Sequence, residues 1–180
     1  MVRVRDGQVE TLAELYSRHR TRLFNFFVRL TGNTHLSEDL VQEVFLRMLK
    51  YRHTFKPESR FTTWMYQIAR NAHHDAWRKA RHETAADDDE SNDAQPLWTS
   101  QSAPDWEAER NQDVAILQEA LAALPLESRE VLMLTRFQDL KYEEVARVLE
   151  CSVSAVKMRV FRAMQELRQS FRRLAGKEAV

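Results

Sequence analysis

Residues 142–167 read YEEVARVLECSVSAVKMRVFRAMQEL, and this stretch decides the fold of the chain around it. A short helical segment, Tyr142 to Leu149, is followed by the joint Glu150-Cys151-Ser152 and by a longer basic helical segment from Ser154 to about Leu174. A short helix, a three-residue joint and a longer helix form the helix-turn-helix pattern, which places its second helix in the major groove of DNA. The stretch therefore predicts a helix-turn-helix unit.

The second helix of this unit has one apolar face and one polar, basic face. At 100° per residue, Val156, Val160, Ala163 and Leu167 cluster within about 60° of one another, so we expect them to face the core. Lys157 and Arg159 flank the opposite face, where they could meet the phosphates on the two sides of a major groove. A basic surface helix with extended arginines is the alternative. The residues that point away from the core are Ser154, Met158, Phe161, Arg162 and Gln165.

Two further helices are predicted before this unit. One covers residues 106–123, with Val114, Leu117, Leu121 and Leu124 on one face, and Pro125 ends it. The next runs from Ser128 to Phe137.

The whole chain of 180 residues has the composition of a helical protein. Three glycines and four prolines are few, and Leu, Ala, Arg and Glu dominate, so we expect an all-α fold. The single cysteine, Cys151, excludes an internal disulfide and a cysteine-based zinc site, and a buried structural thiol is expected. The N-terminus lacks an apolar signal core and no apolar run approaches about 18 residues, so we expect a cytoplasmic protein.

The net charge of zero conceals three blocks of different sign. Residues 1–82 carry +7, residues 83–113 carry −9, and residues 114–180 carry +2. Residues 83–105 have no helical period and are rich in acidic and small residues, which is typical of a flexible linker. We therefore predict two helical domains, 1–82 and 106–180, joined by an acidic linker at 83–105; the basic domains indicate a polyanionic partner, and a solvated charged surface is the alternative.

The first domain contains three predicted helices. The first has a stripe made of Leu12, Leu15, Tyr16, Leu23, Phe26, Phe27 and Leu30, and Gly32-Asn33 ends it. The second is expected to be capped by Ser37 and to bury Leu40, Val41, Val44, Phe45 and Met48. The third, FTTWMYQIARNAHHDAWRKARH at 61–82, is expected to be capped by Thr62 or Thr63 and to bury Trp64, Ile68, Ala72 and Ala76.

The rest of residues 61–82 combines aromatic, histidine and cationic side chains. Adjacent residues His73 and His74 diverge by 100° on a helix, and the chain has no Glu-x-x-His pair, so we predict no metal site and no cofactor. A helical-bundle enzyme is also disfavoured, because the sequence lacks the grouped metal ligands or the nucleophile with its base that such an enzyme would need.

Three motifs carry a family resemblance. Residues 124–167 resemble region 4 of bacterial sigma-70-type factors, and SEDLVQEVFLRML (37–49) and residues 61–82 resemble region 2 of the extracytoplasmic-function (ECF) branch. Their order and spacing match that branch. The resemblance implies a dissociable, non-enzymatic subunit of RNA polymerase that selects promoters and assists melting of the −10 element. A stand-alone helix-turn-helix regulator is the alternative, and it predicts a dimerisation or ligand domain in the first half.

The resemblance also implies which residues act. Region 2 of such factors captures the −10 strand, and this implies roles for Phe55, Lys56, Arg60, Arg70, Asn71, Trp77, Arg78, Lys79 and Arg81. Asn71 matches an asparagine that recognises a flipped base, and residues 55–60 match a loop that helps to form its pocket. The segment with Asp39, Gln42 and Glu43 is implied to dock on the polymerase β′ subunit. The implied −35 contacts are Ser154, Lys157, Met158, Arg159, Phe161 and Arg162.

The resemblance implies partners and also marks two departures. The partners are the β′ and β subunits of core polymerase, duplex and single-stranded promoter DNA, and an anti-sigma factor, which in this family is often membrane-anchored; no small-molecule substrate is implied. The family usually has glycine where this chain has Glu150, and Gly-Thr where it has Ser154-Ala155. A residue other than glycine at the turn predicts a joint that is either strained or slightly re-routed.

Overall fold

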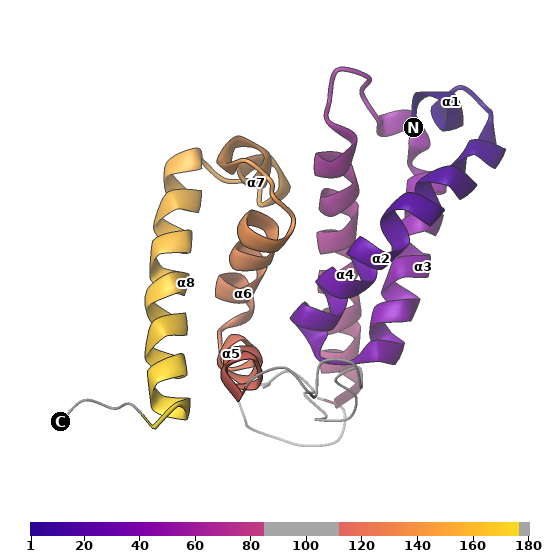
Figure 1. The fold of residues 1–180 in the computed structure, drawn as a ribbon. Helices are drawn as coiled ribbons and strands as arrows, with labels where there is room; N and C mark the ends of the chain where they lie inside the picture. Colours follow the sequence, from indigo (N-terminus) through magenta and orange to yellow (C-terminus); the bar gives the residue numbers. More distant parts are fainter. Residues whose placement is uncertain (85–111, 177–180) are drawn as a thin grey trace.

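The computed structural model describes residues 1–84 and 112–176, and within these ranges every regular element is helical (Figure 1). The predicted all-α fold is confirmed. The first half comprises α1 (Val2–Arg5), η1 (Val9–Thr11), α2 (Leu12–Thr31), α3 (Thr34–Lys50), η2 (Arg52–Thr54) and α4 (Phe61–Thr84). The second comprises α5 (Gln112–Ala122), α6 (Leu126–Leu132), the π-helical segment η4 (Met133–Phe137), α7 (Tyr142–Val148) and α8 (Val153–Leu174). Most of the predicted linker, from residue 85 onward, lies outside the described residues.

Helices α2, α3 and α4 pack against one another, and the turn between α2 and α3 follows from two residues. Gly32 adopts a left-handed φ of 67°, a conformation that glycine reaches without a Cβ penalty, and it ends α2 as predicted. Asn33 then caps α3, because its side chain accepts a hydrogen bond from the Leu36 N–H. The predicted cap at Ser37 is wrong: Ser37 is buried within α3 and donates its hydroxyl to the Asn33 carbonyl at 2.6 Å.

The predicted caps of α4, Thr62 and Thr63, both lie inside the helix. The helix begins at Phe61, and Thr63 is buried with its hydroxyl 3.3 Å from the Glu144 carboxylate, so it serves a contact with the second half. The predicted apolar face is confirmed: Ile68 and Ala72 are buried, and Trp64 and Ala76 pack against the core at its edge.

The predicted helix-turn-helix is formed by α7 and α8. Glu150, in the joint between them, has φ 52°, so the strain expected of a turn without glycine is present. Ser152 caps α8 by accepting from the Ala155 N–H at 3.1 Å. Cys151 in the same joint is half-buried and unoxidised, less enclosed than the buried thiol that was expected.

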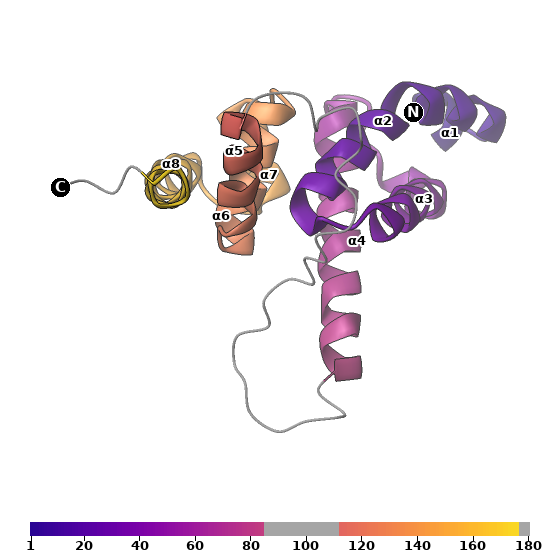
Figure 2. The ribbon, with the colours of Figure 1, turned by 60° about the horizontal axis from the view of Figure 1, so that its bottom comes forward.

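The two faces of α8 lie as the periodicity predicts. Val156, Val160 and Ala163 are buried and Leu167 packs against them. In both views α8 lies on the far side of α5–α7 from the first half (Figures 1 and 2). The face predicted for the helix over residues 106–123, which the structure describes as α5 from Gln112 onward, is only partly correct, because Leu121 and Leu124 are buried but Leu117 is exposed.

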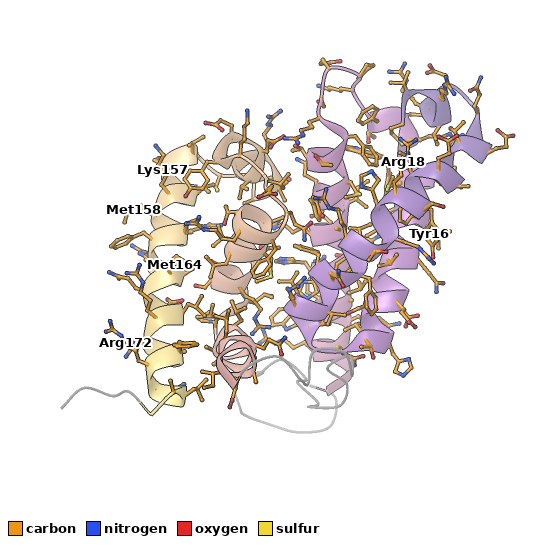
Figure 3. All side chains as sticks on the ribbon, viewed as in Figure 1. Tyr16, Arg18, Lys157, Met158, Met164 and Arg172 are labelled. Atoms are coloured by element: carbon orange, nitrogen blue, oxygen red, sulfur yellow. The ribbon has the colours of Figure 1, made fainter. Side chains whose placement is uncertain are left out.

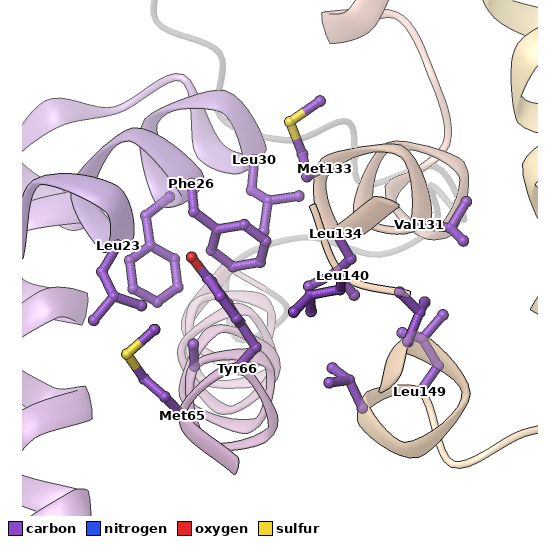
Figure 4. Packing of buried hydrophobic residues seen from close by; sticks show 14 of the residues in the cluster. Leu23, Phe26, Leu30, Met65, Tyr66, Val131, Met133, Leu134, Leu140 and Leu149 are labelled. Carbon is purple, nitrogen blue, oxygen red and sulfur yellow. The ribbon is translucent and has the colours of Figure 1, made fainter. Parts of the chain in front are cut away.

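The apolar cores of the two halves are continuous. Leu23, Phe26, Leu30 and Tyr66 of the first half lie opposite Met133, Leu134 and Leu140 of the second (Figure 4). Beside this cluster, Arg129 is fully buried and donates to the carbonyls of Leu30 at 2.6 Å, Leu121 at 3.0 Å and Leu124 at 2.9 Å. The same guanidinium therefore ties the end of α2 to the corner between α5 and α6, and burial lowers the pKa of Arg129 to about 10.

Among the described residues, no helix combines the length and apolar character that crossing a membrane requires.

Candidate nucleic-acid interface

The outward face of α8 presents apolar and cationic side chains together. Met158 and Phe161 are 52% and 58% exposed, and Lys157 and Arg162 are exposed as well. Lys157 and Met158 project from the outer side of α8, away from the first half (Figure 3). Arg159 is half-buried, and the hydroxyl of Ser154 lies 2.9 Å from that of Ser152 at the helix start. Bases in a major groove are read by apolar contact with thymine methyl groups and by hydrogen bonds from arginine or lysine, and this face offers both.

A groove of about 490 Å³ lies between the end of α3 and the middle of α4. This volume falls in the range of about 300–1,000 Å³ that is usual for small-ligand sites. Asn71 is exposed in it, and Ile68 supplies a buried apolar side chain. The residues that line the groove are Arg47, Tyr51, Ile68, Arg70, Asn71, His74, Asp75 and Arg78.

Charged groups along this groove form one connected network across α3 and α4. Arg47 donates to the Glu43 carboxylate at 2.6 Å and to the Asp75 carboxylate at 2.7 Å. Arg78 also pairs with Asp75. The hydrogen bond from Arg47, followed by that from Arg78, holds the pKa of Asp75 below its usual value. The charged side chains on the two sides of the groove therefore hold one another in position.

The loop at 55–60 and Asn71 are not brought together, although one pocket was expected. Asn71 lies ten positions after Phe61 along α4, which corresponds to about 15 Å of helix. Phe55 is buried, with its ring 5.4 Å from Trp64, so in this arrangement it serves packing. Lys56 is exposed at the loop tip.

Two of the arginines expected to contact the −10 strand are paired with carboxylates of the second half. Arg60 donates to both oxygens of Glu144 at 2.9 Å, and Arg70 lies 3.3 Å from Glu130. Both carboxylates are buried. Burial would raise the pKa of Glu144, but the hydrogen bonds from the Lys141 N–H and from Arg60 outweigh it, and this pKa lies below its usual value. Arg60, just before α4, and Arg70, within it, thus form ion pairs between the two halves.

The end of α4 carries the remaining cations expected to follow a DNA backbone. Trp77 is half-buried, and the Arg81 guanidinium lies 5.3 Å from its ring centroid. Lys79 is exposed on the same turn.

The predicted docking residues lie on the outer side of α3. Asp39 and Gln42 are exposed, and Glu43 is half-buried in its contact with Arg47. Leu46, which is 62% exposed, extends the same face because it lies seven residues after Asp39. Neither Leu46 nor Tyr51 was predicted as a site residue from the sequence. Helical spacing from Asp39 points to Leu46, whereas nothing local in the sequence places Tyr51 near Asn71.

The histidines of α4 do not form a metal site within the described ranges, which contain no cluster of three or more candidate ligands. His73 is buried, and burial, with only partial compensation from Glu130, lowers its pKa to about 4. His74 lies 3.4 Å from Glu130 at the contact between the halves. Both histidines therefore belong to the packing of α4 against the second half.

An outward basic recognition helix, together with a second helix that carries an amide-bearing groove, defines an all-helical DNA-binding protein. The family model for sigma-70 region 2 matches residues 15–83, and that for sigma-70 region 4 matches residues 115–167. The RNA polymerase sigma factor CarQ of Myxococcus xanthus is 32% identical, with 94% of each chain covered. The ECF RNA polymerase sigma factor SigM of Bacillus subtilis is 30% identical over 91% of this chain and 96% of its own. The chain belongs to the ECF branch of the sigma-70 family.

Solved structures of similar fold cover both halves. The sigma factor RpoE of Bartonella quintana, solved in complex with the anti-sigma factor NepR, gives a TM-score of 0.69 at 22% identity over 93% of this chain and 98% of its own. CnrH, solved with the cytosolic domain of CnrY, gives 0.68 at 23% identity over 99% of this chain and 96% of its own. The protein is thus an RNA polymerase sigma factor, and the alternative of a stand-alone regulator is not favoured.

Proposed function

We propose that the two halves of this sigma factor divide promoter recognition between them. In this proposal α8 reads the −35 element as duplex DNA, and α4 holds the −10 strand as it melts. The chain itself catalyses nothing; it acts in the cytoplasm as a subunit of polymerase. The observation that carries the proposal is the outward face of α8, where Arg162 and Lys157 flank exposed Phe161 and Met158. Val156 and Val160 of the same helix are buried.

The proposal assigns α3 to core polymerase. Asp39 and Gln42 are exposed one turn apart, and Leu46 adds an apolar contact to the same face. A mixed acidic and apolar stripe suits a basic partner surface with an apolar centre, as protein interfaces commonly have. The partner of this stripe is the β′ subunit, and β is expected to contact the second half.

The −10 assignment covers Asn71 and the cations of α4. Lys56, Arg78, Lys79 and Arg81 would attract the phosphates of a single strand, and Trp77 is an aromatic ring near them. Arg60 and Arg70 can take part only after they leave Glu144 and Glu130, so strand binding in this proposal requires α4 to separate from α6 and α7.

Regulation by an anti-sigma factor is part of the proposal. It rests on the fold shared with RpoE, whose structure was solved with NepR bound. Co-expression with an anti-sigma factor is expected to lower transcription from the promoters that this sigma factor recognises.

Reconstitution tests the proposal as a whole. Core polymerase with the full chain should co-purify and initiate at a defined set of promoters, whose starts are mapped by sequencing the transcripts. The mapped promoters should share a −35 and a −10 element at constant spacing. Binding to core without such a shared pair of elements would contradict the division of labour between α8 and α4.

A further inference from the structure

An exposed tyrosine stands in the same groove as Asn71. Tyr51 caps the end of α3 and is 44% exposed, and it lines the groove of about 490 Å³ together with Asn71 and Ile68. Among the eight lining residues it is the one with a phenol ring. An unstacked base needs an aromatic plane to stack on, a polar group for its edge and room to enter, and the groove contains all three.

The backbone holds this tyrosine in place. Its N–H donates to the Arg47 carbonyl at 2.8 Å, and its own carbonyl accepts from the Thr54 N–H at 2.9 Å and the Thr54 hydroxyl at 2.8 Å. The ring therefore projects from a fixed point at the junction of α3 and η2. A platform that is ordered before binding loses less entropy when a ligand arrives.

The charges around the ring suit a nucleotide rather than an isolated cation or anion. The Lys50 ammonium lies 5.2 Å from the Tyr51 ring centroid, within reach of a phosphate that flanks a stacked base. The Asp75 carboxylate would repel a phosphate, but Arg47 and Arg78 both engage it. Aromatic rings with nearby cations are the usual means of holding single strands without reading every base.

We infer that Tyr51 is a stacking residue for an unpaired base of the promoter strand, in the groove whose polar contact is Asn71. This inference deepens the proposed function of α4 and rests on it. It places the base against the end of α3, whereas the resemblance implied a role for the loop at 55–60, which does not line this groove.

The test uses holoenzyme made from core polymerase and the full chain. The probe is a fluorescent single-stranded oligonucleotide that carries the −10 strand of a promoter mapped by transcript sequencing. Tyr51→Leu, which keeps an apolar side chain but removes the ring, should weaken binding about tenfold, whereas Tyr51→Phe should bind within about twofold of the parent. His53→Ala, an exposed neighbour that does not line the groove, is the matched control and should bind as the parent does.

Two further measurements separate stacking from a structural role. Affinity for core polymerase and for duplex −35 DNA should be the same in Tyr51→Leu and parent, and a probe with 2-aminopurine at the stacked position should be brighter with Tyr51→Leu. Parent-like strand binding by Tyr51→Leu, or an equal loss in the Leu and Phe variants, would overturn the inference.

Asn71→Ala separates failure of the stacking role of Tyr51 from failure of the −10 assignment of the groove. If Asn71→Ala loses strand binding and Tyr51→Leu does not, the groove binds DNA but the tyrosine does not stack. If neither variant loses binding while the holoenzyme still initiates, the −10 assignment of the groove itself is wrong.

Discussion

At the scale of single residues, the turn of the helix-turn-helix contains a conformation that its residue does not favour. Glu150 has φ 52°, where an L-residue places its Cβ close to backbone atoms at a cost of roughly 1–2 kcal/mol. The family usually has glycine at this position. The chain thus retains local strain in the joint that sets the orientation of α8.

Replacing Glu150 by glycine should stabilise the protein. Relief of the strain outweighs the greater backbone entropy of glycine in the unfolded chain, about 0.5–1 kcal/mol, so the free energy of unfolding should rise by up to about 1 kcal/mol. Thermal unfolding should shift upward by about 2–4 °C. Gln165→Gly, at an exposed site inside α8 where the backbone is helical, should instead lose about 1 kcal/mol. Equal losses in both variants would contradict the strain argument.

His73 should make stability depend on pH. Its pKa is lowered from 6.5 to about 4 because burial disfavours the imidazolium, so the unfolded chain binds the proton more tightly than the folded one. The contribution of neutral His73 to the free energy of unfolding is fully present above about pH 6.5. It falls as the pH drops toward 4 and changes no further below that pH. The whole change is about 3 kcal/mol. The groups facing His73 are Glu130, His74 and Arg129.

Chemical denaturation at pH 7.5 and pH 4.5 measures this dependence. His73→Gln should lose less stability between the two pH values than the parent, whereas His53→Gln, at an exposed position, should follow the parent. If His73→Gln lost as much stability between the two pH values as the parent does, the acid sensitivity would come from other groups.

At the scale of elements, α8 combines sequence reading with phosphate contact on one face. Arg162→Ala should relax the preference for the −35 sequence by about 1–3 kcal/mol, because a base contact distinguishes one base from another. Lys157→Ala should weaken binding to all sequences alike and lower the salt slope by about one. Titration of −35 duplexes with single-base changes at several salt concentrations measures both. Reversed behaviour of the two variants would mean that the strained joint has rotated α8.

The outer face of α3 makes a separate prediction. Asp39→Arg combined with Gln42→Ala should weaken binding to core polymerase at least tenfold and leave thermal unfolding within about 2 °C, because both side chains are exposed. Leu46→Ser should weaken binding as well, because the leucine extends the same face. Glu10→Arg, an exposed charge reversal outside α3, is the control. Unchanged affinity for core in the double variant would remove α3 from the docking surface.

Periodicity predicted the faces of these elements better than their ends. Val156, Val160 and Ala163 repeat at helical spacing, and burial of such a stripe outweighs local preferences, so the inward face of α8 was predictable. The start of α3 was not, because Asn33 and Ser37 are both good caps and only the folded geometry shows which one accepts the Leu36 N–H. The groove beside Asn71 was also missed in part, because Tyr51 lies on a different helix end and carries no periodic signal.

At the scale of the whole molecule, contacts between the halves could not be predicted from the sequence. They join residues 60 to 99 positions apart, such as Arg70 with Glu130 and Arg129 with the Leu30 carbonyl. Local patterns contain no information about such pairs. Arg60 and Arg70 were expected to contact DNA, whereas in the structure they pair with the carboxylates of Glu144 and Glu130.

The carboxylates at this contact should control access to α4. Glu130→Gln combined with Glu144→Gln removes both negative charges while keeping amide oxygens that can accept hydrogen bonds. Each hydrogen bond to a charged group that is lost costs about 1.5–3 kcal/mol. The apolar contacts around Tyr66 and Met133 remain, so the chain should stay folded but open more often. The radius of gyration from X-ray scattering should increase, and the free chain should bind single-stranded −10 DNA more tightly than the parent.

Glu127→Gln combined with Glu143→Gln provides a control of equal charge change. Both residues are exposed and lie on α6 and α7, the helices that carry Glu130 and Glu144. A general gain in DNA affinity from two fewer negative charges would appear in both double variants, whereas release of Arg60 and Arg70 would appear only in the first. Because the released arginines bind phosphates, the extra affinity should shrink as salt rises. Equal affinity and equal scattering in the two double variants would show that these ion pairs do not hold the halves closed.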